Sequence, residues 1–297
     1  MVNIYVIAGP TATGKTKVAI ELAKRINGEI VSCDSMQLYK YMNIGSAKPT
    51  KEELEEVKHH LIGVVDPSEF FTVAKYQKLA YEAIDDIVSR GKTPVVVGGT
   101  GLYLNSLIYE MDFAAKPLNA KRRIELESMS AEVLYAYLSE INCGAAGRIH
   151  PNNKKKVIRA IEATELGKEV KPFEECNIKN QAYDFKLYGL NWDRKVLYER
   201  INQRVENMIS EGLVDEVKHM FSLGLTCDNF SMKGIGYKEI IEYLNGNYNL
   251  EDAIYLIKRN TRHFAKRQQT WFKKYEDMIW IDVDEDTEVA DIVEKIL

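Results

Sequence analysis

Residues 9–16 read Gly9-Pro10-Thr11-Ala12-Thr13-Gly14-Lys15-Thr16, the most informative segment of the chain. It matches the phosphate-binding P-loop pattern G-x-x-x-x-G-K-[ST] in full. An apolar run at 2–8 precedes it and an amphipathic run at 17–26 follows it, which predicts the strand, loop and helix that the motif needs. The sequence therefore predicts a site for a diphosphate or a triphosphate. The motif alone does not say which, or what happens to it.

The chemistry of such a loop rests on its backbone. Glycines let several backbone N–H groups converge on one anion, and the start of the following helix adds the positive end of its dipole. We expect all eight residues to bind phosphate, with Lys15 at the terminal phosphates. The Thr16 hydroxyl is then placed to ligate Mg²⁺, the one cofactor that we expect.

Composition excludes several classes of protein. The chain has 297 residues, 45% hydrophobic and 28% charged, which indicates a globular protein of one large or two modest domains. No apolar run is long enough to cross a bilayer, and the N-terminal apolar stretch has no basic flank. Cys33, Cys143, Cys176 and Cys227 are scattered without metal-ligand spacing, which is typical of reduced, unligated thiols. We expect a cytoplasmic protein that does not enter membranes.

Charge is distributed unevenly. The formal net charge is −4, so any contact with nucleic acid requires a local basic patch. Residues 258–274 read KRNTRHFAKRQQTWFKK, with seven Lys or Arg and no carboxylate. On a helix, Arg259, Arg262, Lys266 and Arg267 lie on roughly one side. This pattern favours a helix that faces nucleic acid, and the alternative is a solvated basic helix.

The N-terminal part of the chain alternates strands and helices. Strands are expected at 3–8, 29–33 and 94–97, with helices at 15–26 and 72–90. This alternation predicts a parallel sheet covered by helices.

From about residue 112 the pattern changes. Helices dominate (121–128, 131–139 and 153–166), and strands return at 185–190 and 278–282. We expect an α/β, P-loop NTPase-like parallel-sheet core at 1–111 and 180–297. A mostly helical domain at 112–179 is inserted into it.

Three loops follow the expected strands at the edge where such sheets bind ligands: 9–16, 34–37 and 98–103. Asp34 ends the second strand, where it could act as a general base or a Mg²⁺-associated acceptor, or could cap the following turn. The third strand ends in Gly98-Gly99-Thr100-Gly101, without the Walker-B acid of ATP-hydrolysing proteins. A group-transfer enzyme fits better than a motor ATPase. A small-molecule kinase stays open.

Further motifs extend this pattern along the chain, from Ile7 to Phe272. They are GPTATGKT (9–16), DSMQ (34–37), GSAKP (45–49), HHLI (59–62), GGTGLY (98–103), RAIE (159–162), R-x-x-x-R (200–204), GYKE (236–239) and KRQQTWF (266–272). In this order they resemble the tRNA dimethylallyltransferase family. That family moves a dimethylallyl group from its diphosphate to N6 of the adenosine 3′-adjacent to the anticodon.

The resemblance implies roles for particular residues. The P-loop would hold the donor's pyrophosphate and not ATP, with Lys15 and Thr16 on pyrophosphate and Mg²⁺. Asp34 would be the base or hydrogen-bond acceptor for N6. Thr100 and Arg123 would contact tRNA near the reacting base, and Arg204 would assist the departing pyrophosphate.

The resemblance also implies partners and a tRNA-contacting surface. The partners are dimethylallyl diphosphate and the anticodon stem–loop of tRNA, bound by a monomer. Besides Asp34, Thr100 and Arg123, the tRNA-binding residues would be Ser35, Met36, Gln37, Lys155, Lys156, Val157, Ile158, Arg159, Lys233, Gly234, Ile235, Gly236, Tyr237, Lys238, Lys266, Arg267, Gln268, Gln269, Thr270, Trp271, Phe272 and Lys273.

One segment departs from the family pattern His-Pro-Asn-Asp-x-x-Arg. This chain has Asn153 in place of the Asp and Lys156 in place of the Arg. Lys keeps the charge but lacks the bidentate fork of Arg, so phosphate contacts in the insert are expected to be looser.

Some alternatives stay open. A cytokinin-type adenylate prenyltransferase shares the P-loop core, and a non-catalytic tRNA-binding protein would share the basic helix. His59 and His60 could orient a substrate or have a structural role. Tyr237 could equally pack in the core.

Overall fold

The computed structural model describes residues 2–111, 120–167 and 178–297. The chain divides into two compact units: Met1–Ile108 with Gln181–Leu297 form the first, and Tyr109–Asn180 the second. The sequence had predicted an insert at 112–179. The two units are described in turn.

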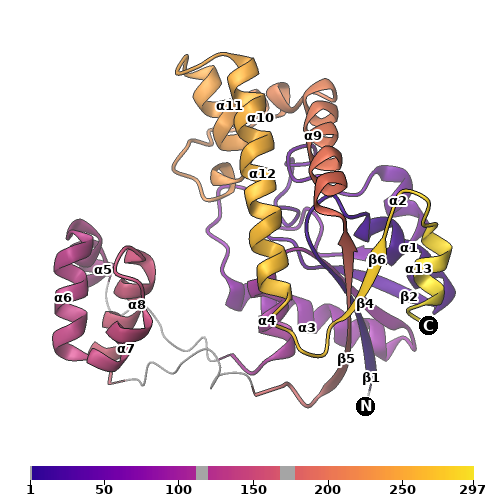
Figure 1. Ribbon diagram of the computed structural model, residues 1–297, viewed down its shortest axis with the longest axis horizontal. Coiled ribbons are helices and arrows are strands. Elements are labelled where there is room, and N and C mark those ends of the chain that lie inside the picture. The colour runs from indigo at the N-terminus through magenta and orange to yellow at the C-terminus, as the bar shows by residue number, and fades with distance from the viewer. Residues whose placement is uncertain (1, 112–119, 168–177) are drawn as a thin grey trace. The chain divides into compact units, whose positions relative to one another are not determined.

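The first unit contains a six-stranded, parallel sheet (Figure 1). The strand order is β3-β2-β4-β1-β5-β6. The strands are β1 (Val2–Ala8), β2 (Gly28–Ser32), β3 (His59–His60), β4 (Thr93–Gly98), β5 (Tyr183–Trp192) and β6 (Ile279–Val283). The predicted α/β fold class is confirmed, and the five predicted strands each overlap an observed one. The two-residue strand β3 was not predicted.

Helices cover both faces of this sheet (Figure 1). Helix α1 (Lys15–Arg25) follows the P-loop and packs against α13 (Val289–Glu294), while α3 (Val73–Ser89) packs against α4 (Gly101–Ile108). Because both faces are covered, the central strands are apolar almost throughout, as in other parallel sheets. Ile4 and Ile7 of β1 are fully buried, for example.

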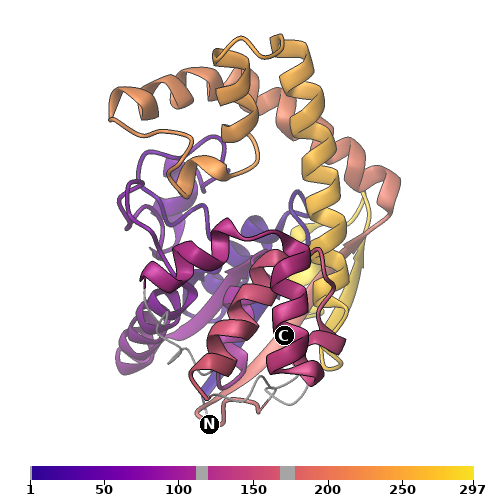
Figure 2. The same cartoon turned by 90° about the vertical axis from the view of Figure 1, so that its left-hand side faces the viewer.

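The remaining helices of the first unit lie near the carboxyl ends of the strands. They are α2 (Lys51–Glu56), α9 (Arg194–Ser210), α10 (Leu213–Ser222), η2 (Ser231–Lys233), α11 (Tyr237–Leu244) and α12 (Leu250–Phe272). The segment around η2 lies beside the loops that follow β2 and β3 (Figures 1 and 2). The Ser231 hydroxyl donates to the Pro67 carbonyl there, at 2.7 Å.

The second unit is helical in the described residues. Its helices are α5 (Ala120–Ser128), α6 (Ala131–Ile141), α7 (Cys143–Arg148) and α8 (Lys154–Glu165). Leu126, Leu134, Leu138 and Val157 belong to a core of its own. Asn153 is the N-cap of α8, where its side chain accepts from Lys156 N. The asparagine that replaces the family's aspartate is therefore still a capping residue.

The two histidines of β3 have structural contacts. His60 Nε2 lies 2.7 Å from the Glu29 carboxylate at the amino end of β2, and His59 Nδ1 lies 2.7 Å from the Val57 carbonyl. Arg90 and Lys92 also bind Glu29, so this buried carboxylate is surrounded by cations. These contacts hold β3 to the sheet and favour the structural role of the histidines.

Two further expectations concern membranes and thiols. Within the described ranges, no helix combines the length and the apolar character needed to cross a bilayer. Cys33 is a buried free thiol, while Cys143 and Cys227 are exposed free thiols. Cys176 lies outside the described residues.

Candidate functional site

Three loops meet at the carboxyl edge of the sheet. The P-loop follows β1, residues 33–37 follow β2, and residues 99–100 follow β4, which lies between β1 and β2 in the sheet. The approach of β4 to β2 is close: a Cβ on Gly98 would lie 2.1 Å from the Cys33 carbonyl oxygen. The sheet therefore brings together the three loops that the sequence singled out.

The P-loop has the backbone conformation of an anion cradle. Gly9 and Gly14 have φ values of +136° and +88°, and Ala12 has φ +65°. Glycine adopts such values without steric cost, whereas Ala12 is held there by its surroundings. Arg200 of α9 contributes to this, because its Nε donates to the Ala12 carbonyl at 3.0 Å.

Side-chain donors bind two further carbonyl oxygens of the loop, those of Pro10 and Thr13. Thr13 Oγ1 and Lys15 Nζ both donate to Pro10 O, and Trp192 Nε1 donates to Thr13 O at 3.1 Å. With its carbonyls anchored in this way, the loop is preorganised for a ligand that accepts hydrogen bonds.

Lys15 of the P-loop and Arg204 of α9 are buried cations whose charges act on one another. The pKa of Lys15 is lowered to about 7, chiefly by burial and also by the positive charge of Arg204, against the opposing effect of Asp34. Burial likewise lowers the pKa of Arg204. Two desolvated cations beside a ring of backbone amides form a strong site for a polyanion.

Asp34 shapes the turn after β2. Its Oδ1 accepts from Met36 N at 2.9 Å and from Gln37 N at 3.4 Å, so the turn-capping alternative is realised. Within the described part of the chain, no hydrogen bond reaches its other oxygen, Oδ2, which leaves this oxygen for a ligand. Capping and a role as base are therefore compatible.

Thr100 joins the β4 loop to the β2 loop. Its Oγ1 accepts from Ser35 N at 3.0 Å, and its backbone N–H donates to Cys33 O at 3.1 Å. The Thr100 hydroxyl therefore lies beside the residue that follows Asp34. The buried thiol of Cys33, the residue directly after β2, has its pKa raised to about 12 by desolvation, so it stays a neutral thiol.

Gln268 of α12 links the P-loop to the β4 loop. Its Oε1 accepts from Thr11 N at 2.9 Å, and its Nε2 donates to Gly99 O at 2.8 Å. A Cβ on Gly99 would lie 2.2 Å from that amide nitrogen. The side chain is buried, and these two contacts hold it within the site, while its contact with tRNA stays a prediction.

The two aromatic residues of the KRQQTWF motif, Trp271 and Phe272, also turn inward. Phe272 is fully buried in the core, and Trp271 lies against Gly101, where a Cβ would be 2.4 Å from the indole ring. Lys266, Arg267, Thr270 and Lys273 are exposed on the opposite side. One face of α12 therefore contacts the P-loop and the β4 loop, and the other face carries exposed cations.

The four cations expected on one side of α12 differ in their surroundings. Arg259, Lys266 and Arg267 are exposed, but Arg262 Nη1 donates to Asn202 of α9 at 2.6 Å. Lys258 likewise pairs with Glu206 of α9. The reason is that α9 packs beside α12 and covers that flank, which the sequence of α12 alone does not reveal.

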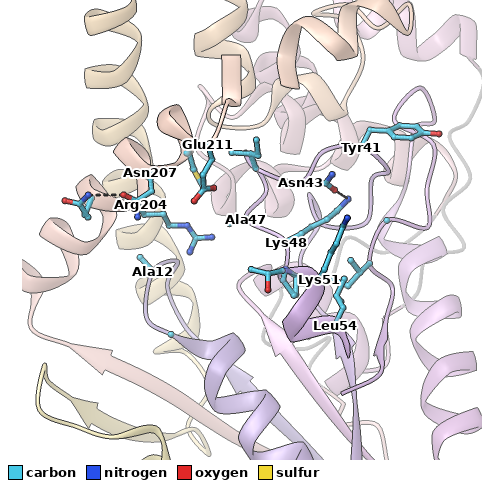
Figure 3. Close-up of a pocket in the computed structure, with 18 of the residues that line it drawn as sticks. Ala12, Tyr41, Asn43, Ala47, Lys48, Lys51, Leu54, Arg204, Asn207 and Glu211 are labelled. Atoms are coloured by element: carbon cyan, nitrogen blue, oxygen red, sulfur yellow. Dashed lines mark hydrogen bonds between the residues drawn. The ribbon is translucent and has the colours of Figure 1, made fainter. Parts of the chain in front are cut away.

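A cavity of about 970 Å³ adjoins the P-loop (Figure 3). Ala12 and Gly14 form one part of its wall, α9 contributes residues that include Arg204, and the loop at 40–51 forms the opposite wall. Lys48 and Lys51 extend from that wall, and Arg204 points inward from the other side (Figure 3). Burial lowers the pKa of Lys48 to about 8. Lys48 belongs to the GSAKP motif, whose sequence alone indicates no role for this lysine.

The residues present fit a magnesium ion held together with a diphosphate. Thr16 offers a hydroxyl at the start of α1, and Asp34 offers a carboxylate oxygen. No group of three or more His, Cys, Asp or Glu side chains arranged for a metal occurs among the residues that the structure describes. Mg²⁺ commonly takes one or two protein oxygens and completes its shell with phosphate and water.

The segment 233–238 packs against the loop that carries Asp34. A Cβ on Gly234 would lie 2.6 Å from Met36 Cε. Lys233 and Lys238 are exposed, whereas Tyr237 is fully buried and donates its hydroxyl proton to Glu216 at 2.7 Å. Tyr237 is therefore a core residue, one of the two alternatives left open.

The remaining predicted tRNA contacts belong to the second unit. Arg123 donates to Glu162 at 2.6 Å and to Glu127 at 2.7 Å. On α8, Lys155, Lys156 and Arg159 are exposed, and Val157 and Ile158 point into the core of that unit. The site described above consists of residues of the first unit.

The fold and the site together define a class: a P-loop α/β protein with a preorganised anion cradle. A carboxylate stands after β2, and β4 ends in glycines instead of the Walker-B acid. Comparison with known proteins then gives the family. The family model described as IPP transferase matches residues 37–275, so the chain belongs to the IPP transferase family.

Individual relatives agree over nearly the whole chain. The chain is 49% identical to a tRNA dimethylallyltransferase of Alkaliphilus oremlandii, covering 99% of this chain and 96% of that protein. It is 50% identical to one of Acetivibrio thermocellus, covering 96% and 93%.

Among solved structures, the tRNA isopentenylpyrophosphate transferase of Bacillus halodurans matches with a TM-score of 0.75 at 44% identity. That match covers 100% of this chain and 96% of the other. A eukaryotic dimethylallyltransferase described as acting on tRNA matches with a TM-score of 0.84 at 32% identity, covering 96% of this chain and 75% of the other.

Proposed function

We propose that this chain is a tRNA dimethylallyltransferase. It transfers the dimethylallyl group of dimethylallyl diphosphate to N6 of the adenosine 3′-adjacent to the anticodon (position 37), in tRNAs that read codons beginning with U. The products are N6-isopentenyladenosine and pyrophosphate. The observation that carries the proposal is a sequence identity of 49–50% to relatives with that name over nearly the whole chain. The anion cradle supports it, because the neighbouring strand β4 lacks the Walker-B acid of ATP-hydrolysing proteins.

The arrangement suits this reaction. As the allylic C–O bond breaks, positive charge develops on carbon and negative charge on pyrophosphate. The P-loop amides, Lys15 and Arg204 stabilise the anion as it forms. The N6 lone pair forms the new bond to carbon, after which Asp34 Oδ2 accepts the N6 proton.

Mg²⁺, held by Thr16 with the diphosphate, would supply further charge neutralisation on the leaving group. The adenine must leave its stack to reach Asp34, at a cost of a few kcal/mol, and a single-stranded loop keeps that cost low. The exposed cations of 233–238 and α12 would bind the tRNA backbone. We further propose that the protein acts as a monomer in the cytoplasm, which size-exclusion chromatography and fractionation test.

The decisive experiment uses labelled dimethylallyl diphosphate, Mg²⁺ and unmodified tRNA, followed by mass spectrometry of the nucleosides. We expect label on N6 of one adenosine per tRNA and loss of transfer when Mg²⁺ is chelated. Label on AMP instead of tRNA would identify an adenylate prenyltransferase. Consumption of ATP without tRNA would identify a kinase, and tRNA binding without any transfer would identify a binding protein.

A further inference from the structure

Glu216 of α10 binds the loop that forms the far wall of the cavity. Its Oε2 accepts from Asn43 N and Ile44 N, both at 2.8 Å, and its Oε1 accepts from Gly45 N at 3.0 Å. A single carboxylate thus satisfies three consecutive backbone amides. Hydrogen bonds to a charged acceptor are about twice as strong as neutral ones.

The fourth donor to this carboxylate comes from another motif. Tyr237 of α11 is fully buried, and its hydroxyl donates to Glu216 Oε1 at 2.7 Å. The ring of Tyr237 also packs on Gly45, where a Cβ would lie 2.6 Å from it. GSAKP and GYKE, two motifs that the chemistry of the reaction leaves unexplained, therefore meet at Glu216.

The loop held in this way lines the cavity. Asn43, Ile44, Ala47, Lys48 and Pro49 all form part of its wall. The backbone is strained on both sides of the Glu216 contacts, with φ +63° at Tyr41 and +48° at Ala47. Such conformations in non-glycine residues persist only when surrounding contacts hold them.

Lys48 depends on the same loop. Its Nζ donates to Tyr39 O and to Asn43 Oδ1, and Asn43 is one of the residues whose amide binds Glu216. The other end of the loop is held by Gln37, whose Nε2 donates to Ala47 O at 3.0 Å. Glu216 and Gln37 thus hold the two ends of the wall opposite the P-loop.

We propose that Glu216 is a positioning residue for the donor site: it fixes the loop at 43–49, and with it Lys48, opposite the P-loop, and so sets the affinity for the diphosphate donor. The functional part of this inference rests on the proposed prenyl transfer. The loop-fixing part does not.

The test compares Glu216→Gln with Asp215→Asn, a control on the same helix. Asp215 is exposed and pairs only with Lys218 in the contacts that the structure describes. Glu216→Gln places an amide donor against backbone donors, so we expect the 43–48 amides to lose protection in hydrogen-exchange mass spectrometry without substrate. Asp215→Asn leaves that protection unchanged.

The same variants are then assayed with substrates. For Glu216→Gln we expect the KM for dimethylallyl diphosphate, and the Kd for inorganic pyrophosphate, to rise about tenfold, with kcat and the Kd for tRNA within about twofold. Tyr237→Phe removes one of the four donors and should give about a threefold rise. It serves as the milder variant if Glu216→Gln does not fold.

Three outcomes separate this inference from the proposed function. Unchanged exchange and unchanged pyrophosphate affinity in both Glu216→Gln and Tyr237→Phe would overturn the role of Glu216, even with wild-type transfer intact. A kcat loss without a KM change would overturn it too. Absence of transfer by the wild type would instead refute the proposed reaction, while exchange and pyrophosphate binding would still decide whether Glu216 fixes the loop.

Discussion

Two groups of cations in the first unit have contrasting surroundings. Lys15 and Arg204 lie beside the P-loop, where burial lowers the pKa of each. Arg259, Lys266 and Arg267 are exposed on the outer face of α12. Charges in a desolvated pocket act strongly over short distances, whereas exposed charges act through a screened field. The buried cations are therefore expected to act on the reacting phosphate groups, and the exposed cations of α12 on the binding of a polyanion.

The largest expected effect is at Asp34, the carboxylate after β2 whose charge acts on Lys15 and Arg204. Asp34→Asn keeps an oxygen for Met36 N and Gln37 N, so the turn stays capped, but removes the proton acceptor. We expect kcat to fall by about 10²- to 10⁴-fold with the Kd for tRNA unchanged, measured by single-turnover transfer and by filter binding. Retained turnover would remove the role of Asp34 as a base.

The second largest effect is expected at Gln268, the α12 residue that links the P-loop to the β4 loop. Gln268→Ala leaves Thr11 N and Gly99 O without their partner, so the two loops lose their link. We expect kcat/KM to fall by about 10- to 100-fold with tRNA affinity unchanged. Gln269→Ala is the matched control, since Gln269 binds only Asn191 in the described contacts. Equal effects of the two variants would contradict the division of the helix into two faces.

A pH titration distinguishes the buried cation from the exposed ones. With a pKa of about 7, Lys15 is protonated below that pH and neutral above it in the free protein. Binding of the anionic donor requires the charged form, so donor affinity should fall by up to about tenfold per pH unit above 7, with proton uptake on binding.

Calorimetry in buffers of different ionisation enthalpy measures that uptake. Lys15→Arg is the control, because a guanidinium stays charged over this range and the donor's own titration is the same in both proteins. Equal proton uptake by the two proteins would show that Lys15 is charged in the free state.

The smallest effects are expected on the outer face. Arg259→Ala and Lys266→Ala should each weaken tRNA binding several-fold and reduce the slope of log Kd against log salt by about one, with kcat unchanged. Lys258→Ala and Arg262→Ala serve as controls, because these side chains bind Glu206 and Asn202 of α9. A uniform response of all four would mean that α9 does not divide the basic face.

The local sequence pattern was sufficient to predict the helices and strands and to locate the motifs with candidate catalytic and binding residues. The P-loop, the strands on either side of it and the carboxylate after β2 are each specified by a few neighbouring residues, and the structure brings them to one edge. Periodicity also predicted helices in the second unit, because its apolar residues recur at helical spacing.

What the sequence could not specify were the contacts between distant segments. Gln268 lies 257 residues from Thr11, and Glu216 lies 173 residues from Asn43. Both are polar residues on helices, where exposure is the usual expectation. For the same reason Arg262 was grouped with exposed cations, although α9 covers it. The sequence of a motif identifies residues with a functional role, but only the packing of neighbouring elements shows which of its side chains are buried and which are exposed.

The position of β1 has a consequence for how the chain is made. β1 is paired on one side with β4 and on the other with β5, which spans Tyr183–Trp192. During synthesis, β1, β2 and β4 are available long before β5, and the apolar flank of β1 then has an open hydrogen-bonding edge. The emerging N-terminal half therefore has an aggregation-prone edge until β5 has left the ribosome and paired with β1. Shielding of that edge by a chaperone would matter most over this interval of translation.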